Sequence, residues 1–286
     1  MGLREVLDAG GFAITAEICP PRGADVSEFL AKARFLKGKI AAANVTDNQR
    51  AVMRLASLAC AVHLLREGID PVFQVTCRDR NRLALQSDIL GAWALGVRNI
   101  LALTGDHVSF GDHREAKPVF DIDSVQLVGV ISGLNRGFSM NGKELRGKTD
   151  FLIGAVVAPE ADPFAPEEIK FEKKISSGAR FFQTQAIFDM EKFKRFFDGA
   201  EKTGAKILGG LLLLKSAKMA HYLNKNVPGV KVPEDIIREL EGSKDELKKG
   251  IEIASRQLRE LKKFCHGAHI MAIGQEESVV SIIEGA

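Results

Sequence analysis

The sequence predicts a single-domain α/β protein of the (β/α)8 (TIM) barrel class. Three observations predict this fold: eight short apolar runs recur along the 286 residues, helix-patterned stretches separate them, and 45% of the residues are hydrophobic. Runs that are apolar almost throughout are typical of strands buried on both faces, as parallel strands are. A chain of this length accommodates one large core, so we expect residues 1–286 to form one domain.

The predicted strands follow one another at intervals that leave room for a helix between neighbours. In order they are Phe12 to Cys19, Ile40 to Asp47, Pro71 to Cys77, Asn99 to Asp106, Leu152 to Pro159, Phe181 to Phe188, Lys206 to Leu213 and Ala268 to Ile273. Two of the intervening stretches have apolar residues at three- and four-residue spacing and end in a glycine, at Gly68 and at Gly96. The charged stretch from Lys231 to Lys263 predicts a solvated helix pair ahead of the last strand.

An open, doubly wound parallel sheet would show the same alternation of strands and helices. No GxGxxG motif opens the first helix and no GxxxxGK[ST] motif occurs, so the phosphate-binding signatures of open sheets are missing. The first strand ends instead in Pro20-Pro21-Arg22-Gly23. We therefore favour the closed barrel.

Charge and cysteine content argue against several classes of protein. The 40 Lys+Arg and 37 Asp+Glu residues are interspersed, with a formal net charge of +3. Proteins that bind nucleic acid or a membrane surface normally carry a one-sided basic stripe, so neither partner is expected. The four cysteines form no CxxC pair, which argues against a zinc ribbon, an iron–sulfur cluster or a disulfide scaffold; they are Cys19, Cys60, Cys77 and Cys265.

Other short sequence features argue against further classes of protein and of active site. The N-terminal run follows charged residues and stops at two prolines, so we expect neither a signal peptide nor a membrane span, and predict a cytoplasmic protein with reduced thiols. The histidines show no HExxH spacing, and a capping or core role is favoured for His266 and His269, so no metal is predicted. The absence of a GxSxG elbow leaves a covalent hydrolase without support.

Polar residues inside or at the end of the apolar runs are the first candidates for catalysis, because the carboxyl ends of barrel strands face the active site. Glu17 lies inside the first run. A buried carboxylate is costly unless it is paired, hydrogen-bonded or protonated, and burial raises its pKa toward the range of a general acid. Glu17 is therefore a candidate acid, the alternative being an interior salt bridge with Arg78 or Arg80.

Further polar residues lie inside or at the end of the second, third, fourth and sixth runs: Thr46, Asp47, Gln74, Thr76, Asp106, Gln183 and Gln185. The segment TCRDRNR after the third run concentrates charge at a strand end, and its alternative reading is a helix start capped by Asp79 with arginines on the surface. Gly105 would let the backbone approach a planar ligand next to Asp106. The long polar loop from Gly105 to Lys117 is typical of a loop at a barrel mouth.

These segments, taken together and in order, resemble the methylenetetrahydrofolate reductase family. The resemblance is carried by AEICPPRG in the first run, VTCRDRN after the third, LALTGD after the fourth and TQAIFD in the sixth, and it extends from about Phe12 to Ile283. It implies a flavin-containing (β/α)8 barrel. It also implies the reaction in which reduced flavin delivers hydride to the methylene carbon of 5,10-methylenetetrahydrofolate and yields 5-methyltetrahydrofolate.

The resemblance assigns roles to individual residues. Glu17 corresponds to the acid that helps to open the five-membered folate ring to the reactive iminium, and Asp106 to an aspartate between flavin and pterin. A negative charge there would favour the cationic iminium. Gln185 corresponds to a glutamine that hydrogen-bonds the pterin, and Leu223 replaces a phenylalanine that stacks on the folate in some members.

The resemblance also implies a cofactor and an electron donor. Flavin contacts carry over to Thr46, Gln74, Thr104, Gly105, Asp106, Asp123, Ser124 and Lys174. The expected cofactor is FAD, with FMN as the alternative, because Gln74 and Ala158 replace a histidine and a ring-stacking tyrosine of other members. The expected donor is NAD(P)H, bound where folate later binds, or a small iron–sulfur protein, and an oligomer is expected.

Two other functions remain open at this point. One is a different enzyme on the same barrel, such as a pterin-binding methyltransferase or a lyase, that keeps Glu17 and Asp106 without flavin. The other is a non-catalytic subunit that binds flavin or folate for a partner, which the replacements at Gln74, Ala158 and Leu223 would permit. Flavin colour separates the first from a reductase, and flavin reduction by methyltetrahydrofolate would exclude the second.

Overall fold

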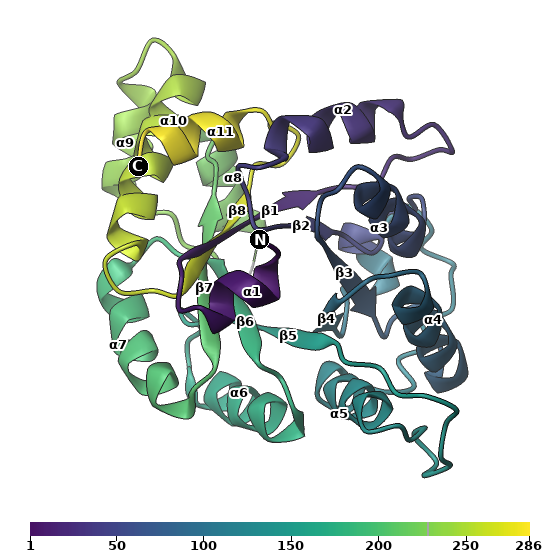
Figure 1. The fold of residues 1–286 in the computed structure, drawn as a ribbon. Coiled ribbons are helices and arrows are strands. Elements are labelled where there is room, and N and C mark those ends of the chain that lie inside the picture. The colour runs from purple at the N-terminus through teal and green to yellow at the C-terminus, as the bar shows by residue number, and fades with distance from the viewer. Residues whose placement is uncertain (228) are drawn as a thin grey trace.

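Eight parallel strands form a closed barrel in the structure, a computed structural model that describes residues 1–227 and 229–286 (Figure 1). The strands are paired in sequence order, and β8 pairs with β1 to close the sheet. An open sheet would leave two unpaired edges, whereas every strand here has two neighbours. The prediction of a (β/α)8 barrel is confirmed, and the doubly wound alternative is wrong.

The observed strands agree closely with the predicted runs. They are β1 Ala13–Ile18, β2 Ala42–Val45, β3 Pro71–Thr76, β4 Asn99–Leu103, β5 Leu152–Val157, β6 Phe181–Ala186, β7 Lys206–Leu212 and β8 Gly267–Met271. Every predicted run extends past the carboxyl end of its strand, because the last residues of the run leave the sheet and begin a loop. These loops lie at the carboxyl ends of the strands, where barrel enzymes carry their active sites.

The helices alternate with the strands and surround the barrel (Figure 1). They are α1 Leu3–Asp8, α2 Ser27–Leu36, α3 Ser57–Arg66, α4 Arg82–Ala94, α5 Ser124–Asn135, α6 Ala165–Ser177, α7 Met190–Ala200, α8 Ala217–Asn226, α9 Glu234–Glu241, α10 Glu246–Leu261 and α11 Ser278–Glu284, with short 3-10 turns η1 Gln49–Ala51, η2 Val108–Phe110 and η3 Glu201–Thr203. The main hydrophobic core lies between the outer face of the sheet and these helices.

Helix α1 closes the amino end of the barrel. Its buried Leu3 and Leu7 join a cluster with residues from the amino-terminal halves of the strands, including Leu101 and Phe181. The Leu3 N–H donates to Asp70 at 2.9 Å, which caps the helix against the barrel floor. In Figure 1 this helix lies over the centre of the barrel. The opposite end is therefore the one left for a site.

Helices α9 and α10 occupy the predicted helix pair ahead of the last strand. Helix α10 is only half solvated, because Ile253, Leu258 and Leu261 are buried against the rest of the fold. Its charged residues face outward, as expected of an amphipathic helix. Helices α8 and α9 enclose a second, smaller core with the ends of β6 and β7.

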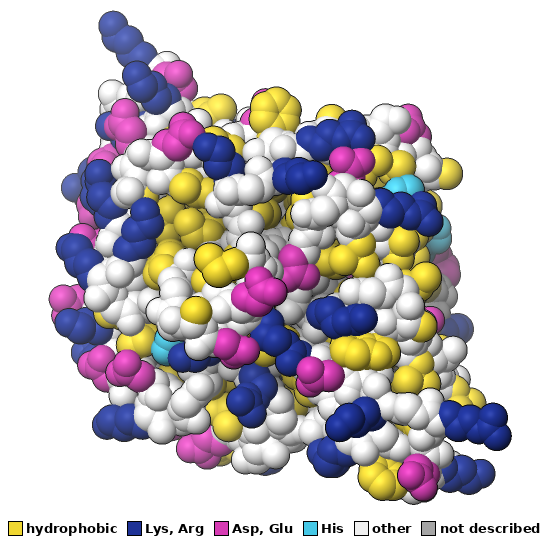
Figure 2. Space-filling model, in the orientation of Figure 1, with side chains coloured by type: hydrophobic (Ala, Val, Ile, Leu, Met, Phe, Trp, Pro, Cys, Tyr) yellow, Lys and Arg dark blue, Asp and Glu magenta, His cyan; other side chains and the backbone are white. Residues whose placement is uncertain are grey.

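The face drawn in Figure 2 carries positive and negative side chains side by side, without a one-sided basic stripe. In the described part of the chain, no helix has both the length and the apolar composition needed to cross a bilayer.

Candidate active site

Glu17 lies near the carboxyl end of β1, with a side chain that is 13% exposed. Its Oε1 accepts a hydrogen bond from Gln49 Nε2 at 2.9 Å, and its Oε2 lies 4.0 Å from His269 Nε2. Burial, with a smaller contribution from the nearby charge of Glu276, raises the pKa of Glu17 from 4.5 to about 7 against the lowering effect of the Gln49 hydrogen bond. This carboxyl group can therefore hold or release a proton near neutral pH.

The alternative interpretation of Glu17, an interior salt bridge with Arg78 or Arg80, is wrong. Arg78 pairs with Asp79, and Arg80 pairs with Asp47 and Asp88. Each guanidinium is held by carboxylates of its own side of the barrel, so neither reaches β1.

The raised pKa of Glu17 predicts a pH-dependent stability. An unfolded chain ionises this carboxyl above pH 4.5, while the folded chain keeps it protonated up to about pH 7, so unfolding free energy falls as pH rises between these values. Glu17→Gln removes this effect and should gain about 3 kcal/mol over the natural chain above pH 7, with no gain below pH 4. Denaturant titrations across this pH range measure the difference, and a gain that is equal at every pH would contradict the prediction.

A layer of buried polar side chains lies inside the barrel beside Glu17. The Thr15 hydroxyl lies 2.9 Å from His269 Nδ1, and Gln183 Nε2 donates to Thr15 Oγ1 and to Asn44 Oδ1. Asn44 returns a hydrogen bond to Gln183 Oε1 at 2.7 Å. Burial lowers the pKa of His269 to about 4, so the ring is neutral at physiological pH and forms no salt bridge with Glu17. The core position favoured for His269 is confirmed.

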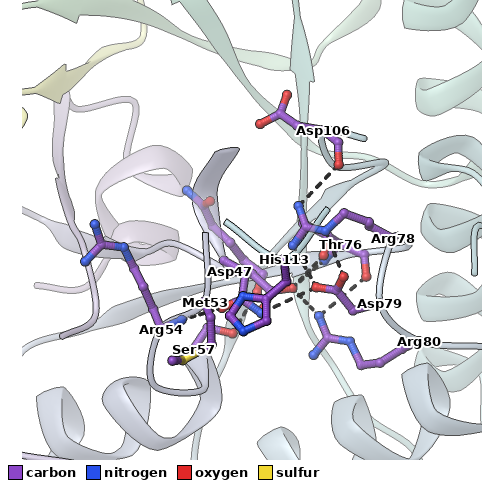
Figure 3. Close-up of polar contacts among 12 residues, drawn as sticks. Asp47, Met53, Arg54, Ser57, Thr76, Arg78, Asp79, Arg80, Asp106 and His113 are labelled. Carbon is purple, nitrogen blue, oxygen red and sulfur yellow. Dashed lines mark hydrogen bonds and ion pairs between the residues drawn. The ribbon is translucent and has the colours of Figure 1, made fainter. Parts of the chain in front are cut away.

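A buried ion pair joins the ends of β2 and β3 (Figure 3). Asp47 accepts hydrogen bonds from the N–H and hydroxyl of Thr76, at 2.8 and 2.9 Å, and from the Arg80 guanidinium. Arg80 also contacts Asp88 on α4. Asp47 accepts all three hydrogen bonds on its Oδ2 and thereby fixes the positions of two neighbouring loops.

One interpretation of the TCRDRNR segment, that Asp79 caps the helix after it, is wrong. Arg78 is only 2% exposed and forms a two-point contact with the Asp79 carboxylate, at 2.7 and 2.8 Å. The cap of α4 is Asn81, which accepts from the N–H groups of Leu83 and Ala84. Asp79 is thus not the helix cap, because its carboxylate is taken by the neighbouring arginine.

Arg78 also reaches the fourth strand, where its NH1 donates to the Asp106 carbonyl at 3.4 Å (Figure 3). The Asp106 carboxylate points away from the guanidinium, and the residue is exposed. The loop that carries Asp106 is thereby tied to the β3 end without neutralising its side chain.

Three of the predicted flavin contacts line one open cavity of about 450 Å³. Thr104 and Gly105 follow β4, and Asp123 is the N-cap of α5. The Thr104 hydroxyl accepts from the Ser124 N–H at 3.2 Å, which ties the strand end to the start of this helix. His107, Phe120, Asp121, Ile122 and Gln126 complete the lining.

The backbone conformation at position 105 and its close neighbours require a glycine there. The φ of Gly105 is +92°, and a Cβ there would lie 3.0 Å from the Thr76 Cβ and 3.2 Å from the Arg78 Cβ. Only glycine fits both the left-handed backbone and this close approach.

The other predicted flavin contacts lie outside that cavity. Thr46 follows β2, is buried, and lies 3.3 Å from the Cys19 sulfur. Gln74 is buried within β3, and no described residue hydrogen-bonds its amide. Lys174 on α6 is buried and donates to the Val156 carbonyl at 2.7 Å, and burial lowers its pKa. Its ammonium is therefore already engaged in this structure.

The two predicted folate contacts differ in their surroundings. Gln185 is exposed at a register shift between β6 and β7, and such a bulge redirects a side chain. The shift is stabilised by Thr184, whose hydroxyl accepts from the Gly210 N–H at 2.8 Å. Leu223 is buried on α8 in the smaller core, where it packs with α9.

The sequence analysis did not single out Gln49, Asn44 or Thr15, all of which join the polar cluster at Glu17. Gln49 lies outside every apolar run, and Asn44 and Thr15 are ordinary residues within strands. The available signal was the alternation of side chains in a barrel strand, which places Thr15 on the same face as Glu17.

Comparison with known proteins settles the family. The sequence profile described as "Methylenetetrahydrofolate reductase" matches residues 2–286. The chain belongs to the methylenetetrahydrofolate reductase family. The prediction made from its motifs is confirmed.

Relatives support this membership at modest identity. The 5,10-methylenetetrahydrofolate reductase of Pectobacterium carotovorum is 29% identical over 231 residues, which cover 77% of this chain and 71% of the relative. The Escherichia coli enzyme is 24% identical over 247 residues, covering 83% of this chain and 76% of that enzyme. Members of the methylenetetrahydrofolate reductase family are flavin-dependent oxidoreductases that act on methylenetetrahydrofolate.

The fold has a close counterpart among solved structures. A Clostridium thermocellum protein, described as binding two copies of 5-methyl-5,6,7,8-tetrahydrofolic acid, has a TM-score of 0.65 at 15% identity and covers 99% of this chain and 97% of its own. At this identity the likeness concerns the barrel alone.

The site residues of this methylenetetrahydrofolate reductase family member fit a flavin. A hydroxyl, a glycine backbone and a helix start border an open cavity at the end of β4, which suits a planar ring. The Gln74 amide lies in the adjacent strand and makes no hydrogen bond with another described residue, so it offers a donor and an acceptor for the polar edge of such a ring.

Proposed function

We propose that this chain reduces 5,10-methylenetetrahydrofolate to 5-methyltetrahydrofolate with a bound flavin, and that Glu17 is its acid. The observation that carries the proposal is the buried Glu17 carboxyl, whose pKa of about 7 suits proton donation at neutral pH. Family membership supports the substrate and the use of a flavin.

The Glu17 side chain performs the proton step. Oε1 is engaged by the Gln49 amide, and this leaves Oε2 as the oxygen that donates the proton to the folate ring nitrogen. Protonation breaks the five-membered ring and generates the electrophilic iminium. A bound flavin supplies the hydride that reduces this methylene carbon.

The charge of the iminium defines the role of Asp106. Its exposed carboxylate lies at the end of β4, next to the cavity that fits the flavin, and is not neutralised by Arg78. A fixed negative charge beside a developing cation lowers the free energy of the cationic state. Asp106 is thus proposed to favour iminium formation and to bind folate.

Gln185 and Leu223 are proposed as the folate contacts. The exposed Gln185 amide, presented by the β6 bulge, provides one donor and one acceptor for the pterin edge. Leu223 is proposed as the apolar folate contact on α8, where 8% of the residue is exposed and the rest packs in the smaller core.

The proposed flavin is FAD, with FMN as the alternative. Thr46, Gln74, Thr104, Gly105, Asp123, Ser124 and Lys174 are its proposed contacts. Lys174 would have to exchange its hydrogen bond with the Val156 carbonyl for a cofactor oxygen. The proposed electron donor is NAD(P)H or an iron–sulfur protein, and the oligomeric state stays a prediction.

One anaerobic experiment tests this function. The purified chain is examined for flavin absorbance, and methyltetrahydrofolate and NADH are then added in separate samples. Bleaching by methyltetrahydrofolate supports the proposal, and bleaching by NADH as well identifies a self-sufficient reductase. A protein that neither contains flavin nor can be reconstituted with FAD or FMN would contradict it, and would favour an enzyme that uses folate without flavin.

Asp106→Asn should weaken folate binding and raise the flavin potential, because it removes a negative charge beside both ligands. Folate-dependent flavin reoxidation is expected to slow by roughly ten- to a hundredfold. Stopped-flow absorbance and a redox titration against reference dyes provide the two values.

Glu115→Gln is the matched control, because Glu115 is an exposed carboxylate of the same loop and loses the same charge. It should leave both values unchanged. Unchanged folate affinity and flavin potential in Asp106→Asn would remove Asp106 from the site.

A further inference from the structure

Gln49 contacts the Glu17 acid from outside the barrel strands. It is the first residue of η1, in the loop that follows β2, and its Nε2 donates to Glu17 Oε1 at 2.9 Å. The Cys19 thiol donates to Gln49 Oε1 at 3.2 Å. The amide is therefore oriented: its oxygen faces the thiol and its NH2 group faces the carboxyl.

The loop that carries Gln49 has an unusual backbone. Asn48, Arg50 and Ala51 have φ values of 45°, 57° and 56°, in the left-handed region that residues with a Cβ rarely adopt. Asparagine adopts this region readily, but at Arg50 and Ala51 it costs about 1–3 kcal/mol each, and backbone strain of this kind is concentrated at functional sites. A sequence without glycine at these positions must be held in place by its surroundings.

Hydrogen bonds with three neighbouring loops fix the position of the loop that carries Gln49. Asn48 accepts from the Arg54 N–H at 2.9 Å and donates to Asp79 at 3.4 Å, which lies beyond β3. The Met53 N–H donates to Asp112 at 3.1 Å, and Arg54 donates to the Pro20 carbonyl (Figure 3 shows Met53, Arg54 and Asp79).

The closest of these contacts is with the loop after β4. A Cβ on Gly111 would lie 1.8 Å from the Ala51 carbonyl oxygen, so the backbones of the two loops are in direct contact and leave no room for a side chain at position 111. The position of Gln49 is thus determined by the ends of β1, β3 and β4 together.

Few other groups act on Glu17. The titratable groups that face it are His269 on β8, Glu276 in the loop after β8, and Cys19 in the loop after β1. His269 is neutral and 4.0 Å away, and Glu276 repels the carboxylate. Among the described residues, Gln49 is the one that donates a hydrogen bond to the Glu17 carboxyl.

We propose that Gln49 is a positioning residue for the Glu17 acid: the strained loop delivers its amide to the barrel mouth, and Cys19 orients that amide toward Oε1. The inference rests on the proposed function, in which Glu17 is the acid. With Oε1 fixed, the carboxyl cannot rotate freely and Oε2 stays directed to the substrate. A carboxyl oriented in advance reacts faster than one that must be ordered at each turnover.

Gln49→Met tests this contact in the full chain, because methionine matches glutamine in size and cannot donate a hydrogen bond. The protonation of Glu17 is followed by infrared difference titration, through the carboxyl stretch that is absent in Glu17→Gln. Loss of the donor should raise the titration midpoint by about 0.5–1 pH unit. Gln49→Glu, which places a second carboxylate there, should raise it further and serves if the methionine variant does not fold.

Arg50→Met is the matched control. Arg50 shares the strained loop, but its guanidinium faces the Tyr222 hydroxyl at 3.4 Å and makes no contact with Glu17. The midpoint should be unchanged in this variant. An equal shift in Arg50→Met, or no shift in either Gln49 variant, would overturn the inference.

Kinetic measurements then test whether the hydrogen bond between Gln49 and Glu17 contributes to catalysis. In Gln49→Met, kcat for folate reduction should fall by about tenfold with KM changed less than about twofold, and the alkaline limb of the pH profile should move upward with the midpoint. A shifted midpoint with unchanged kcat and pH profile would overturn the positioning role.

The infrared titration does not depend on turnover. A failure of the proposed function would appear as missing flavin chemistry in the natural chain, while the midpoints would still report the Gln49 contact. The two failures are therefore distinguishable.

Discussion

Glu17→Gln should slow the reduction of methylenetetrahydrofolate by roughly two to four orders of magnitude, the usual effect of removing a positioned acid. Glutamine keeps the size of the side chain and can still accept the Gln49 hydrogen bond, but it has no proton to donate. Flavin binding, and flavin reduction by an artificial donor, should be unaffected. Stopped-flow reoxidation of the reduced flavin by methylenetetrahydrofolate measures the change.

The control for this variant is Cys19→Ala, in the same loop connection. Cys19 hydrogen-bonds the Gln49 amide and the Thr46 hydroxyl rather than Glu17, so its loss should slow turnover far less than the loss of the acid. Turnover of Glu17→Gln within a few-fold of the natural chain would make Glu17 a structural residue, and the acid would have to be sought elsewhere.

Asp47→Ala should lower the free energy of unfolding by about 3 kcal/mol or more. The Asp47 side chain is 5% exposed and accepts from Thr76 twice and from Arg80. Alanine leaves the Thr76 N–H and hydroxyl without their acceptor and leaves the Arg80 guanidinium only Asp88 as a carboxylate partner. The loss of one partner of a buried pair is far more costly than the net value of the pair. Denaturant titration followed by circular dichroism gives the value.

Glu239→Ala provides the comparison for Asp47→Ala. Glu239 forms a two-point ion pair with Arg256, but those side chains are 35% and 51% exposed. Exposed pairs contribute about 0–1 kcal/mol, so this variant should be nearly neutral. Equal losses in the two variants would mean that burial does not set the strength of the Asp47 pair.

The fold could be predicted because strand and helix periodicity are local properties. Near-continuous apolar runs such as Leu152 to Pro159 marked buried parallel strands. Seven of the eight runs contain the observed strand in full, and the last begins one residue after β8 does. The ends of those strands were less certain, since Thr46 and Asp47 belong to the apolar run Ile40 to Asp47 yet lie beyond β2, which ends at Val45. The local sequence pattern does not show at which residue the backbone hydrogen bonds between two strands end.

Part of the site could not be predicted, because it depends on contacts between distant segments. Asp79 satisfied the local rule for a helix cap, but the buried Arg78 next to it takes the carboxylate and Asn81 caps the helix. The left-handed backbone at Arg50 and Ala51 has no local signal at all, since neither residue is glycine or asparagine. Ala51 meets the backbone of Gly111, 60 positions along the chain, and the local sequence does not show such a contact.

The sequence by itself determined the eight-fold alternation, the family and the position of Glu17 in a buried strand. The tertiary structure decided which groups surround the Glu17 carboxyl. Closure of the barrel brings Thr15 to His269, 254 residues apart, and the loop after β2 brings Gln49 to Glu17, 32 residues apart. The reason is physical. Periodicity follows from the geometry of each element, whereas the protonation and orientation of a buried acid follow from the groups that surround it in space.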